Sequence, residues 1–454
     1  MSSSVYIETL GCQMNVADTE RAATGLRAAG FELTDSAAAA DVVIFNTCSI
    51  RERAAQKVYT RIGEVRKARR HAQPLIGVMG CVAQLEGQAV FAASPAINLV
   101  VGTRATDRLP ALIEQASAGR QKILDLGERG EGESWSVADG ARHSVHVAFV
   151  PIIEGCNKFC SYCIVPYSRG REKSRTPADI VAEVLGLRQR GFREIHLIGQ
   201  NVNSYRPKTD AGLEGFQGAT PFSRLLRAVA ATGMERVKFT TSFPRDFHND
   251  IVAAIEEHEN LCDWVHLPVQ SGSDRVLKAM RRGYKVDDYL RRVEVIKNSG
   301  RRLSLTSDII VGFPGETFGE FEETMRLVEL CQYDGLYIFK YSGRPGTPAA
   351  NLPDSVSKEE KGERFKALEE LQYRIQKEIY RSYINREVKV LVERESAKSK
   401  SDMMGHSTCH KVVNFACDRS LRGQVVNVRV TEAKVNSLYG RMTSQPPTQC
   451  SGNA

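Results

Sequence analysis

The chain has 454 residues, of which 42% are hydrophobic and 26% are charged, and its formal net charge is +8. This length predicts about two to four domains that each bury a core. The start, MSSSVYIETLG, lacks the basic and apolar regions of a signal peptide, and no apolar run reaches the ~18 residues of a membrane span. We therefore expect a soluble, cytoplasmic protein; the positive charge is compatible with a polyanionic partner without establishing one.

Residues 1–120 alternate short apolar runs with helical patterns. SVYIETLGC is predicted as a strand followed by a loop, and DVVIFNTC, PLIGVMGC and INLVVG are predicted strands. Amphipathic helices lie between them, one of them a basic helix from about Ile50 to Arg70. Alternating strands and helices are typical of a parallel α/β sheet, so we predict an N-terminal Rossmann-like domain.

Residues 121–145 are rich in Gly, Glu and Ser, which predicts a linker. Over 146–378 a second alternating series follows, with strands HVAFVPII, EIHLIGQ, RVKFTTSF, WVHLPVQ, LTSDIIVG and GLYIFKYS. These six units fall short of the eight that a closed barrel requires, so an open, partial (β/α)6 barrel is expected.

A long amphipathic helix is predicted within 356–386, with Phe365, Leu368, Leu371 and Ile375 on one face. It leads into residues 379–445, whose short strand patterns predict a small all-β barrel. Residues 446–454 have the composition of a disordered tail.

The chain has eleven cysteines, an odd number without an export signal, which favours metal binding, chemistry or burial over disulfides. Cys156, Cys160 and Cys163 lie within eight residues, in GCNKFCSYC. A structural zinc site needs four ligands, and His143 and His146 upstream could complete one, so that alternative stays open. Three thiolates on a four-iron cube would instead leave one iron free for a substrate or cofactor.

Three other cysteines share one position in their structural units. Cys12, Cys48 and Cys81 each come directly after a predicted buried strand. The carboxyl ends of parallel strands line one edge of a sheet, so these thiols are expected to converge on a second cluster. The alternative is three separately buried cysteines. The others, Cys262, Cys331, Cys409, Cys417 and Cys450, show no such pattern, and we interpret them as core or incidental.

The C-x3-C-x2-C spacing after the first barrel strand resembles the signature of the radical S-adenosylmethionine (SAM) superfamily. The resemblance implies a 4Fe–4S cluster whose open iron chelates SAM and, with one electron, generates a 5′-deoxyadenosyl radical. Tyr162 then lies against the adenine of SAM, and Gln200 and Asn201 stand where the superfamily often has a Gly-Gly-Glu motif. Gln270, Gly312 and Glu316 follow later strands, on the active face of such barrels, where a turn or capping role is the alternative for each.

Nearly the whole chain resembles the methylthiotransferase family, with a TRAM domain as its C-terminal barrel. ETLGCQMN, VPIIEGCNKFCSYCIVPYSRGREKSR, LIGQNVNSY, HLPVQSGSD and SDIIVGFPGET look like the branch of tRNA-2-methylthio-dimethylallyladenosine synthases. Members that act on a ribosomal protein typically have a Pro-Lys pair after the first cysteine, whereas Gln13 and Met14 follow Cys12 here.

The resemblance implies methylthiolation at C2 of the N6-isopentenyladenosine on the 3′ side of the tRNA anticodon. It implies two 4Fe–4S clusters and SAM, with the cluster on Cys12, Cys48 and Cys81 carrying the sulfur. A C2–H bond is too strong for acid/base removal, so we nominate no acid or base. Expected partners are the tRNA anticodon stem–loop, an electron donor such as flavodoxin and a sulfur or iron–sulfur carrier, and we expect a monomer.

Two basic segments and the terminal barrel are possible phosphate contacts. The segments contain Arg169, Arg171, Lys173 and Arg175, and Arg66, Lys67, Arg69 and Arg70. Charge runs are more often solvated faces, and the first segment could also hold the SAM carboxylate.

Several alternatives remain open from the sequence. Within enzymes they are a methylthiotransferase acting on threonylcarbamoyl-adenosine in tRNA or on a ribosomal protein. A different class is a non-catalytic RNA-binding metalloprotein with two zinc sites, which iron and sulfide content would distinguish. An electron-transfer iron–sulfur protein fails to explain the open coordination sites and the six-unit barrel.

Overall fold

The structure is a computed structural model, and it describes residues 3–49, 52–69, 73–119, 122–128, 135–138, 140–397, 399 and 401–444. The chain forms two compact units. The first comprises Met1–Ser144, Phe149–Asn157 and Cys163–Lys173, and the second comprises Val145–Ala148, Lys158–Tyr162 and Ser174–Ala454. Cys156 and Cys163 therefore belong to the first unit, and Cys160 belongs to the second.

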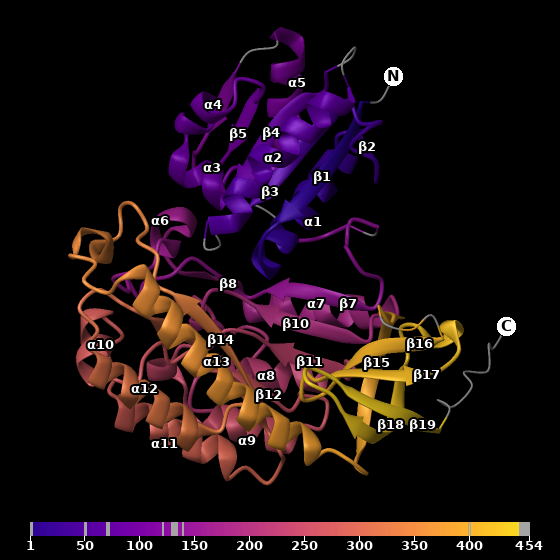
Figure 1. The fold of residues 1–454 in the computed structure, drawn as a ribbon. Coiled ribbons are helices and arrows are strands. Elements are labelled where there is room, and N and C mark those ends of the chain that lie inside the picture. Colours follow the sequence, from indigo (N-terminus) through magenta and orange to yellow (C-terminus); the bar gives the residue numbers. More distant parts are fainter. Residues whose placement is uncertain are drawn as a thin grey trace, which may run out of the picture. The chain divides into compact units, whose positions relative to one another are not determined.

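The first unit is built on a six-stranded sheet with the order β2-β1-β3-β4-β5-β6, in which every neighbouring pair is parallel. Its strands are β1 (Ser4–Leu10), β2 (Glu32–Leu33), β3 (Val42–Thr47), β4 (Leu75–Gly80), β5 (Leu99–Val101) and β6 (Ile123–Asp125). The predicted Rossmann-like parallel sheet is confirmed, and Figure 1 shows its central strands side by side in indigo and purple.

Helices cover both faces of this sheet because both faces carry apolar side chains. The helices are α1 (Gln13–Ala28), α2 (Glu52–Ala68), α3 (Cys81–Glu86), α4 (Ala89–Ala93) and α5 (Leu109–Gly119). One hydrophobic cluster packs α2, α3 and α4 against one face, with Ile62 on Phe45. A second cluster packs α1 and α5 against the other face, through Leu26 and Leu109.

The segment 121–145, which we interpreted as a linker, contributes strand β6 to the sheet. Its later residues contact α1, since the Ala138 N–H donates to Thr24 Oγ1 at 3.0 Å and the His143 N–H donates to Glu20 Oε1 at 3.0 Å. A three-residue strand is too short to produce a period-2 pattern, which is why the sequence did not indicate it.

The second unit contains the six expected barrel strands. They are β7 (Val147–Pro151), β10 (Glu194–Ile198), β11 (Arg236–Phe239), β12 (Trp264–His266), β13 (Ser304–Val311) and β14 (Gly335–Lys340), and β7 extends into the first unit. They form two sheets, β11-β10-β7 and β12-β13-β14, joined by a parallel bridge between Val237 and Leu261. An open six-stranded arrangement was predicted, and it is confirmed.

Helices connect the barrel strands, as the alternating pattern requires. They are α7 (Pro177–Gln189), α8 (Pro221–Ala231), α9 (Asn249–Glu257), α10 (Asp274–Ala279), α11 (Val286–Lys297) and α12 (Phe318–Cys331). Alternate residues of β13 have opposite environments, since Leu305, Ile309 and Val311 are fully buried, whereas Asp308 and Ile310 are only partly buried. The latter two define what we call the inner face of sheet β12-β13-β14.

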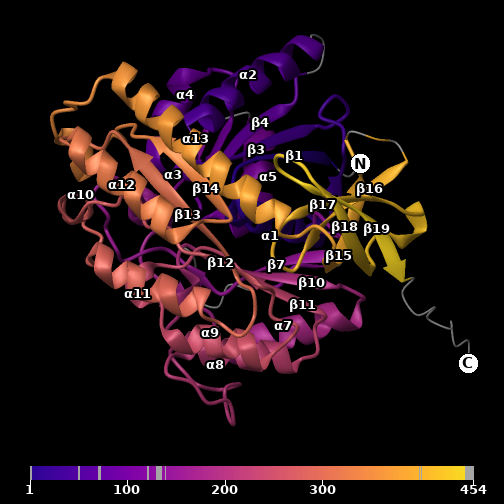
Figure 2. The ribbon, with the colours of Figure 1, turned by 60° about the horizontal axis from the view of Figure 1, so that its bottom comes forward.

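The long helix α13 (Lys358–Arg381) packs against β13 and β14, as Figure 2 shows. It begins at Ser357, whose hydroxyl accepts the Glu360 N–H in a capping box, which stabilises the first turn. Of the predicted apolar face, Leu368, Leu371 and Ile375 are buried and Phe365 is partly buried.

Helix α13 leads into a closed five-stranded barrel with the order β15-β16-β17-β19-β18, drawn in yellow in Figure 1. Its strands are β15 (Glu387–Glu395), β16 (Asp402–Ser407), β17 (Val412–Ala416), β18 (Val425–Ala433) and β19 (Leu438–Ser444). The predicted small all-β barrel is confirmed, and the predicted disordered tail 446–454 lies outside the described residues. None of the helices in the described part of the chain combines the length and apolar character of a membrane span.

The turn between β16 and β17 connects this small barrel to the open six-stranded barrel. Lys411 Nζ lies 2.5 Å from Asp334 Oδ1, and both side chains are almost fully buried. The His410 ring lies 4.5 Å from that of Trp264, and Arg236 donates to the carbonyl of Ser407 at 3.0 Å. Buried ionic contacts of this kind fix the two barrels in one orientation.

Candidate metal centres

The structure brings the three separated thiols together at one edge of the first sheet. Cys48 and Cys81 directly follow β3 and β4 and are buried, and Cys12 follows β1 after Gly11. A hydrogen bond with Cys48 is the main cause that lowers the pKa of Cys12 to about 6. Burial raises the pKa of Cys81, and the nearby charge of Cys12 raises it further. The parallel topology thus produces the convergence expected from the sequence.

Glycines and asparagines shape this edge. Gly80 precedes Cys81 with φ +96°, and a Cβ there would lie 2.4 Å from Asn46 Oδ1 and 2.7 Å from the carbonyl of Thr47. Asn15 Oδ1 accepts the Cys12 N–H at 3.2 Å, while its Nδ2 donates to Asn46 at 3.0 Å. The thiols are therefore held on backbone that buried amides fix in place, because such amides are costly to leave unpaired.

Arg169 joins this thiol site from the basic segment that follows Cys163. Its guanidinium lies 2.6 Å from Asp18 and 3.3 Å from Glu154, and its side chain is 2% exposed. The positive charge of Arg169 and a hydrogen bond with it oppose the rise in the pKa of Cys81 that burial causes. All these residues belong to the first unit.

The other basic candidates divide into buried and exposed groups. Arg175 is buried and lies 2.7 Å from Glu183, so neither it nor Arg169 presents a charge to RNA. Arg171 and Lys173 are exposed. On α2, Arg66 and Lys67 are exposed. Arg69, directly after α2, donates to the carbonyl of Ala40, and Arg70 lies outside the described residues.

Cys156, Cys160 and Cys163, which we call the second triad, lie after the first barrel strand. Cys156 and Cys160 are buried and Cys163 is partly buried. The Cys156 N–H donates to the carbonyl of Gly170 at 3.0 Å, which ties the triad to the residue after Arg169. Gly155 precedes Cys156 with φ +83°, and a Cβ there would lie 2.2 Å from the carbonyl oxygen of Arg171. Only glycine fits this close approach of two backbone segments.

Within the second unit, Arg282 contacts Cys160 and Tyr162, and this residue was missed from the sequence. Its Nη1 donates to Cys160 Sγ at 3.4 Å and to the Tyr162 hydroxyl at 3.3 Å, and its Nη2 donates to the carbonyl of Pro268 at 2.8 Å. The guanidinium also stacks over Phe243 at 4.5 Å. Arg282 lies in the run MRRGY, which carries no signal for burial.

The end of β10 carries Gln200 and Asn201. Gln200 Oε1 is buried and has no hydrogen-bond partner in the described part of the chain. Asn201 is buried and precedes a turn, in which Asn203 holds both the N–H and the carbonyl of Phe243 at 2.8 and 2.9 Å. A buried acceptor without a partner fits a ligand that donates hydrogen bonds, as the amino group of SAM does.

Gln270 follows β12 with φ +80°, a conformation that side-chain-bearing residues rarely adopt. Thr241, after β11, has φ +60°. Gln270 is buried, and its backbone pairs with Asp308 and Ile310 of β13. Strained backbone of this kind concentrates at functional sites, where the surrounding structure holds it in place.

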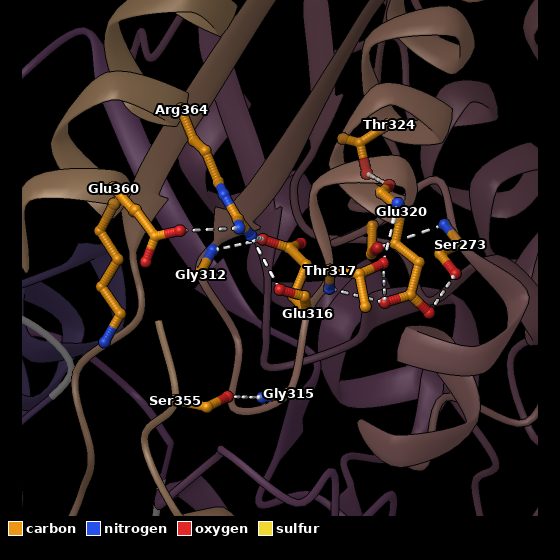
Figure 3. Close-up of polar contacts among 12 residues, drawn as sticks. Ser273, Gly312, Gly315, Glu316, Thr317, Glu320, Thr324, Ser355, Glu360 and Arg364 are labelled. Carbon is orange, nitrogen blue, oxygen red and sulfur yellow. Dashed lines mark hydrogen bonds and ion pairs between the residues drawn. The ribbon is translucent and has the colours of Figure 1, made fainter. Parts of the chain in front are cut away.

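Gly312 and Glu316 lie together in the loop after β13, and Figure 3 shows their contacts. Glu316 Oε2 accepts the Gly312 N–H at 2.7 Å and also accepts from Arg364 Nη1 at 2.7 Å. Burial raises the pKa of Glu316, while these two contacts oppose that shift. The carboxylate therefore holds this loop against α13. This contact agrees with the capping role that the sequence indicated as the alternative for Glu316.

The described residues contain no group of three or more His, Cys, Asp or Glu side chains arranged around a single metal ion. His143, a possible zinc ligand, instead places Nδ1 2.6 Å from Glu20 and stacks on Phe149 at 4.7 Å. A 4Fe–4S cluster binds each thiolate at a different iron, so its cysteines need not meet at one point.

The comparisons with known families divide the chain as the fold does. Residues 150–328 match the Radical SAM superfamily, residues 4–102 match Uncharacterized protein family UPF0004, and residues 381–443 match the TRAM domain. With the open six-stranded barrel and its cysteine motif, these matches define a radical SAM enzyme that has an additional N-terminal sheet and a C-terminal TRAM barrel.

Full-length relatives specify the family. A tRNA-2-methylthio-N(6)-dimethylallyladenosine synthase from Koribacter versatilis is 42% identical over 96% of this chain and 97% of its own length. A synthase of the same name from Solibacter usitatus is 44% identical over 96% of this chain and 97% of its own length. The chain belongs to this family of synthases.

Among solved structures, the chain resembles the radical SAM methyltransferase TsrM from Kitasatospora setae, with cobalamin and a 4Fe–4S cluster bound. The TM-score is 0.56 at 15% identity, covering 77% of each chain. The comparison with the cobalamin-dependent SAM radical enzyme OxsB has a TM-score of 0.54 at 10% identity, covering 82% of this chain and 58% of that chain. At these identities the likeness concerns the fold.

Proposed function

We propose that this protein is a tRNA methylthiotransferase that replaces the C2 hydrogen of N6-isopentenyladenosine, on the 3′ side of the anticodon, with a methylthio group. The observation that carries the proposal is its 42–44% identity, over nearly the full length, to synthases named for this product. The two sets of three thiols, on separate parts of the fold, fit a reaction that needs both a radical and a source of sulfur.

Cys156, Cys160 and Cys163 would hold the 4Fe–4S cluster that supplies the electron for SAM cleavage. Around it, Gln200 Oε1 is an acceptor available to the SAM amino group. Arg282 donates to the hydroxyl of Tyr162, a contact that would orient the ring for the adenine of SAM. Gln270 and Gly312 would border the site from the ends of β12 and β13.

Cys12, Cys48 and Cys81 would hold a second 4Fe–4S cluster, which serves as the store of sulfur. Asp18, Glu154 and Arg169 surround this site with fixed charges. The C2–H bond of adenine has no acidic proton, so neither proposed site requires a side chain poised near neutral pKa. A buried, water-poor setting also suits a radical reaction, because it excludes competing hydrogen donors.

The proposed partner is the anticodon stem–loop of a tRNA that already carries the isopentenyl group. An unstacked loop base can enter a pocket at lower cost than a paired base. Exposed Arg171 and Lys173 and the TRAM barrel are the proposed phosphate contacts. A flavodoxin-type reductant and a sulfur or iron–sulfur carrier would complete the cycle of a monomeric, cytoplasmic enzyme.

The test is anaerobic incubation of the reconstituted protein with SAM, dithionite and tRNA containing isopentenyladenosine, followed by nucleoside mass spectrometry. We expect the modified adenosine to gain one methylthio group. A tRNA bearing threonylcarbamoyl-adenosine serves as the control and is expected to remain unchanged. Formation of 5′-deoxyadenosine with no change in isopentenyladenosine would reject the substrate and leave the radical SAM assignment intact.

A further inference from the structure

The inner face of sheet β12-β13-β14 carries two large aromatic side chains that are half exposed. Tyr337 and Phe339 are 51% and 46% exposed, and both belong to β14, the outermost strand of this sheet. They pair with Asp308 and Ile310 of β13, which places all four on the inner face. Aromatic rings gain much free energy from burial, so two of them exposed side by side on one strand favour a binding surface.

A fixed carboxylate lies beside these rings. His266 Nε2 is 3.4 Å from Asp308 Oδ1, and the His266 ring meets the Tyr337 ring edge to face at 5.8 Å. Thr306 Oγ1 lies 3.0 Å from His266 Nδ1 and accepts the Trp264 indole N–H at 3.0 Å. This series of contacts orients His266 and, through it, Asp308, whose side chain remains 25% exposed.

We propose that His266, Asp308, Tyr337 and Phe339, which we call the inner-face patch, bind the N6-isopentenyladenine base of the RNA. This inference rests on the proposed function and assigns residues that bind its substrate base. The flat base and its isopentenyl chain contact the two rings, and the Asp308 carboxylate accepts the single N6–H. Stacking tolerates any base, so the carboxylate provides the selection for an exocyclic N–H donor.

The chemistry of the patch favours a base over a protein surface. An apolar protein contact would bury the Asp308 carboxylate with no donor beyond His266, which is costly, whereas the N6–H of the base supplies a second donor. The patch also adjoins the proposed SAM site in the same sheet. Phe339 pairs with Ile310, and the Ile310 N–H donates to the carbonyl of Gln270 at 3.0 Å. A base held there lies on the strands whose ends border that site.

The first experiment uses the unaltered reconstituted protein, so folding of a variant does not enter. Fluorescence anisotropy compares two anticodon stem–loop RNAs, one with N6-isopentenyladenosine and one with N6-methyl-N6-isopentenyladenosine, which lacks the N6–H. We expect the second RNA to bind about tenfold more weakly, because its base leaves the carboxylate without a donor. Equal affinities would overturn the role of Asp308.

The second experiment replaces the rings. Phe339→Ala is expected to weaken binding of the isopentenyladenosine RNA by about tenfold or more, and Phe339→Tyr to preserve it. The matched control is Phe318→Ala, an aromatic that is 64% exposed at the start of α12 and outside the patch. The Phe318→Ala control should cleave SAM without RNA as the unaltered protein does.

Equal effects of Phe339→Ala and Phe318→Ala on RNA affinity would overturn the patch. Unchanged RNA affinity together with altered self-association of Phe339→Ala in sedimentation would instead assign the rings to a contact between copies of this chain. Failure of the proposed function is distinct from both outcomes, because there the unaltered protein would fail to methylthiolate the RNA at all.

Discussion

Arg169 Nη2 donates to Asp18 Oδ2 at 2.6 Å, across a sequence separation of 151 residues. Asp18 lies on α1, about one turn after Asn15, and Arg169 follows the second cysteine triad. The ion pair therefore connects the segment behind Cys163 to the thiol site on the first sheet. It also removes Arg169 from the groups that could contact RNA phosphates.

Replacing Arg169 by Met is expected to destabilise the first unit and its thiol site. The change leaves Asp18 and Glu154 buried without their cation, which costs about 3–5 kcal/mol in such settings. Thermal unfolding and iron content measure the effect. Arg171→Met, at an exposed position, is the control and should match the unaltered protein. Equal unfolding temperatures for the two variants would contradict the structural role of Arg169.

Replacing Cys12, Cys48 and Cys81 together by Ala is expected to halve the iron content and to abolish methylthiolation. SAM cleavage should persist, because the second triad is unchanged. Iron and sulfide analysis and 5′-deoxyadenosine formation under dithionite provide the measurements. Cys417→Ala, which is partly buried in the C-terminal barrel, is the control. Unchanged iron in the triple variant would show that these thiols share no cluster.

Gly80→Ala is expected to disturb the thiol site more than Gly30→Ala. Both glycines have positive φ, +96° and +87°, so both substitutions incur about 1 kcal/mol or more of backbone strain. At Gly80 the new Cβ would also lie 2.4 Å from Asn46, whereas nothing lies within 4 Å of the Cβ position at Gly30. Denaturant unfolding measures the free energy of unfolding of the two variants. Equal losses of this free energy would argue against close packing around Gly80.

Lys411→Met is expected to loosen the contact between the two barrels. It leaves the buried Asp334 carboxylate without its cation, at a cost of about 3–5 kcal/mol. Lys389→Met is the control, because Lys389 lies 4.0 Å from a Glu259 side chain that is 94% exposed. Limited proteolysis within 382–412 reports the loosening. A variant as resistant as the control would show that the barrels are held by other contacts.

Regular features of the fold were predictable because they arise from local periodicity. The alternating strands and helices of 1–120 and 146–378 predicted the N-terminal parallel sheet and the open six-stranded barrel, and the placement of Cys12, Cys48 and Cys81 after strands predicted their convergence. Strand β6 was missed, because its three residues carry too little periodic signal.

The sequence by itself determined where the thiols lie, since strand ends in a parallel sheet share an edge whatever the details of packing. Only the tertiary structure decided which charges surround them. Arg169 and Arg175 lie in one basic run, yet each pairs with a carboxylate from a different helix. Arg282 reaches Cys160 across 122 residues. The partner of a long charged side chain depends on which elements pack beside it, and no local pattern encodes that choice.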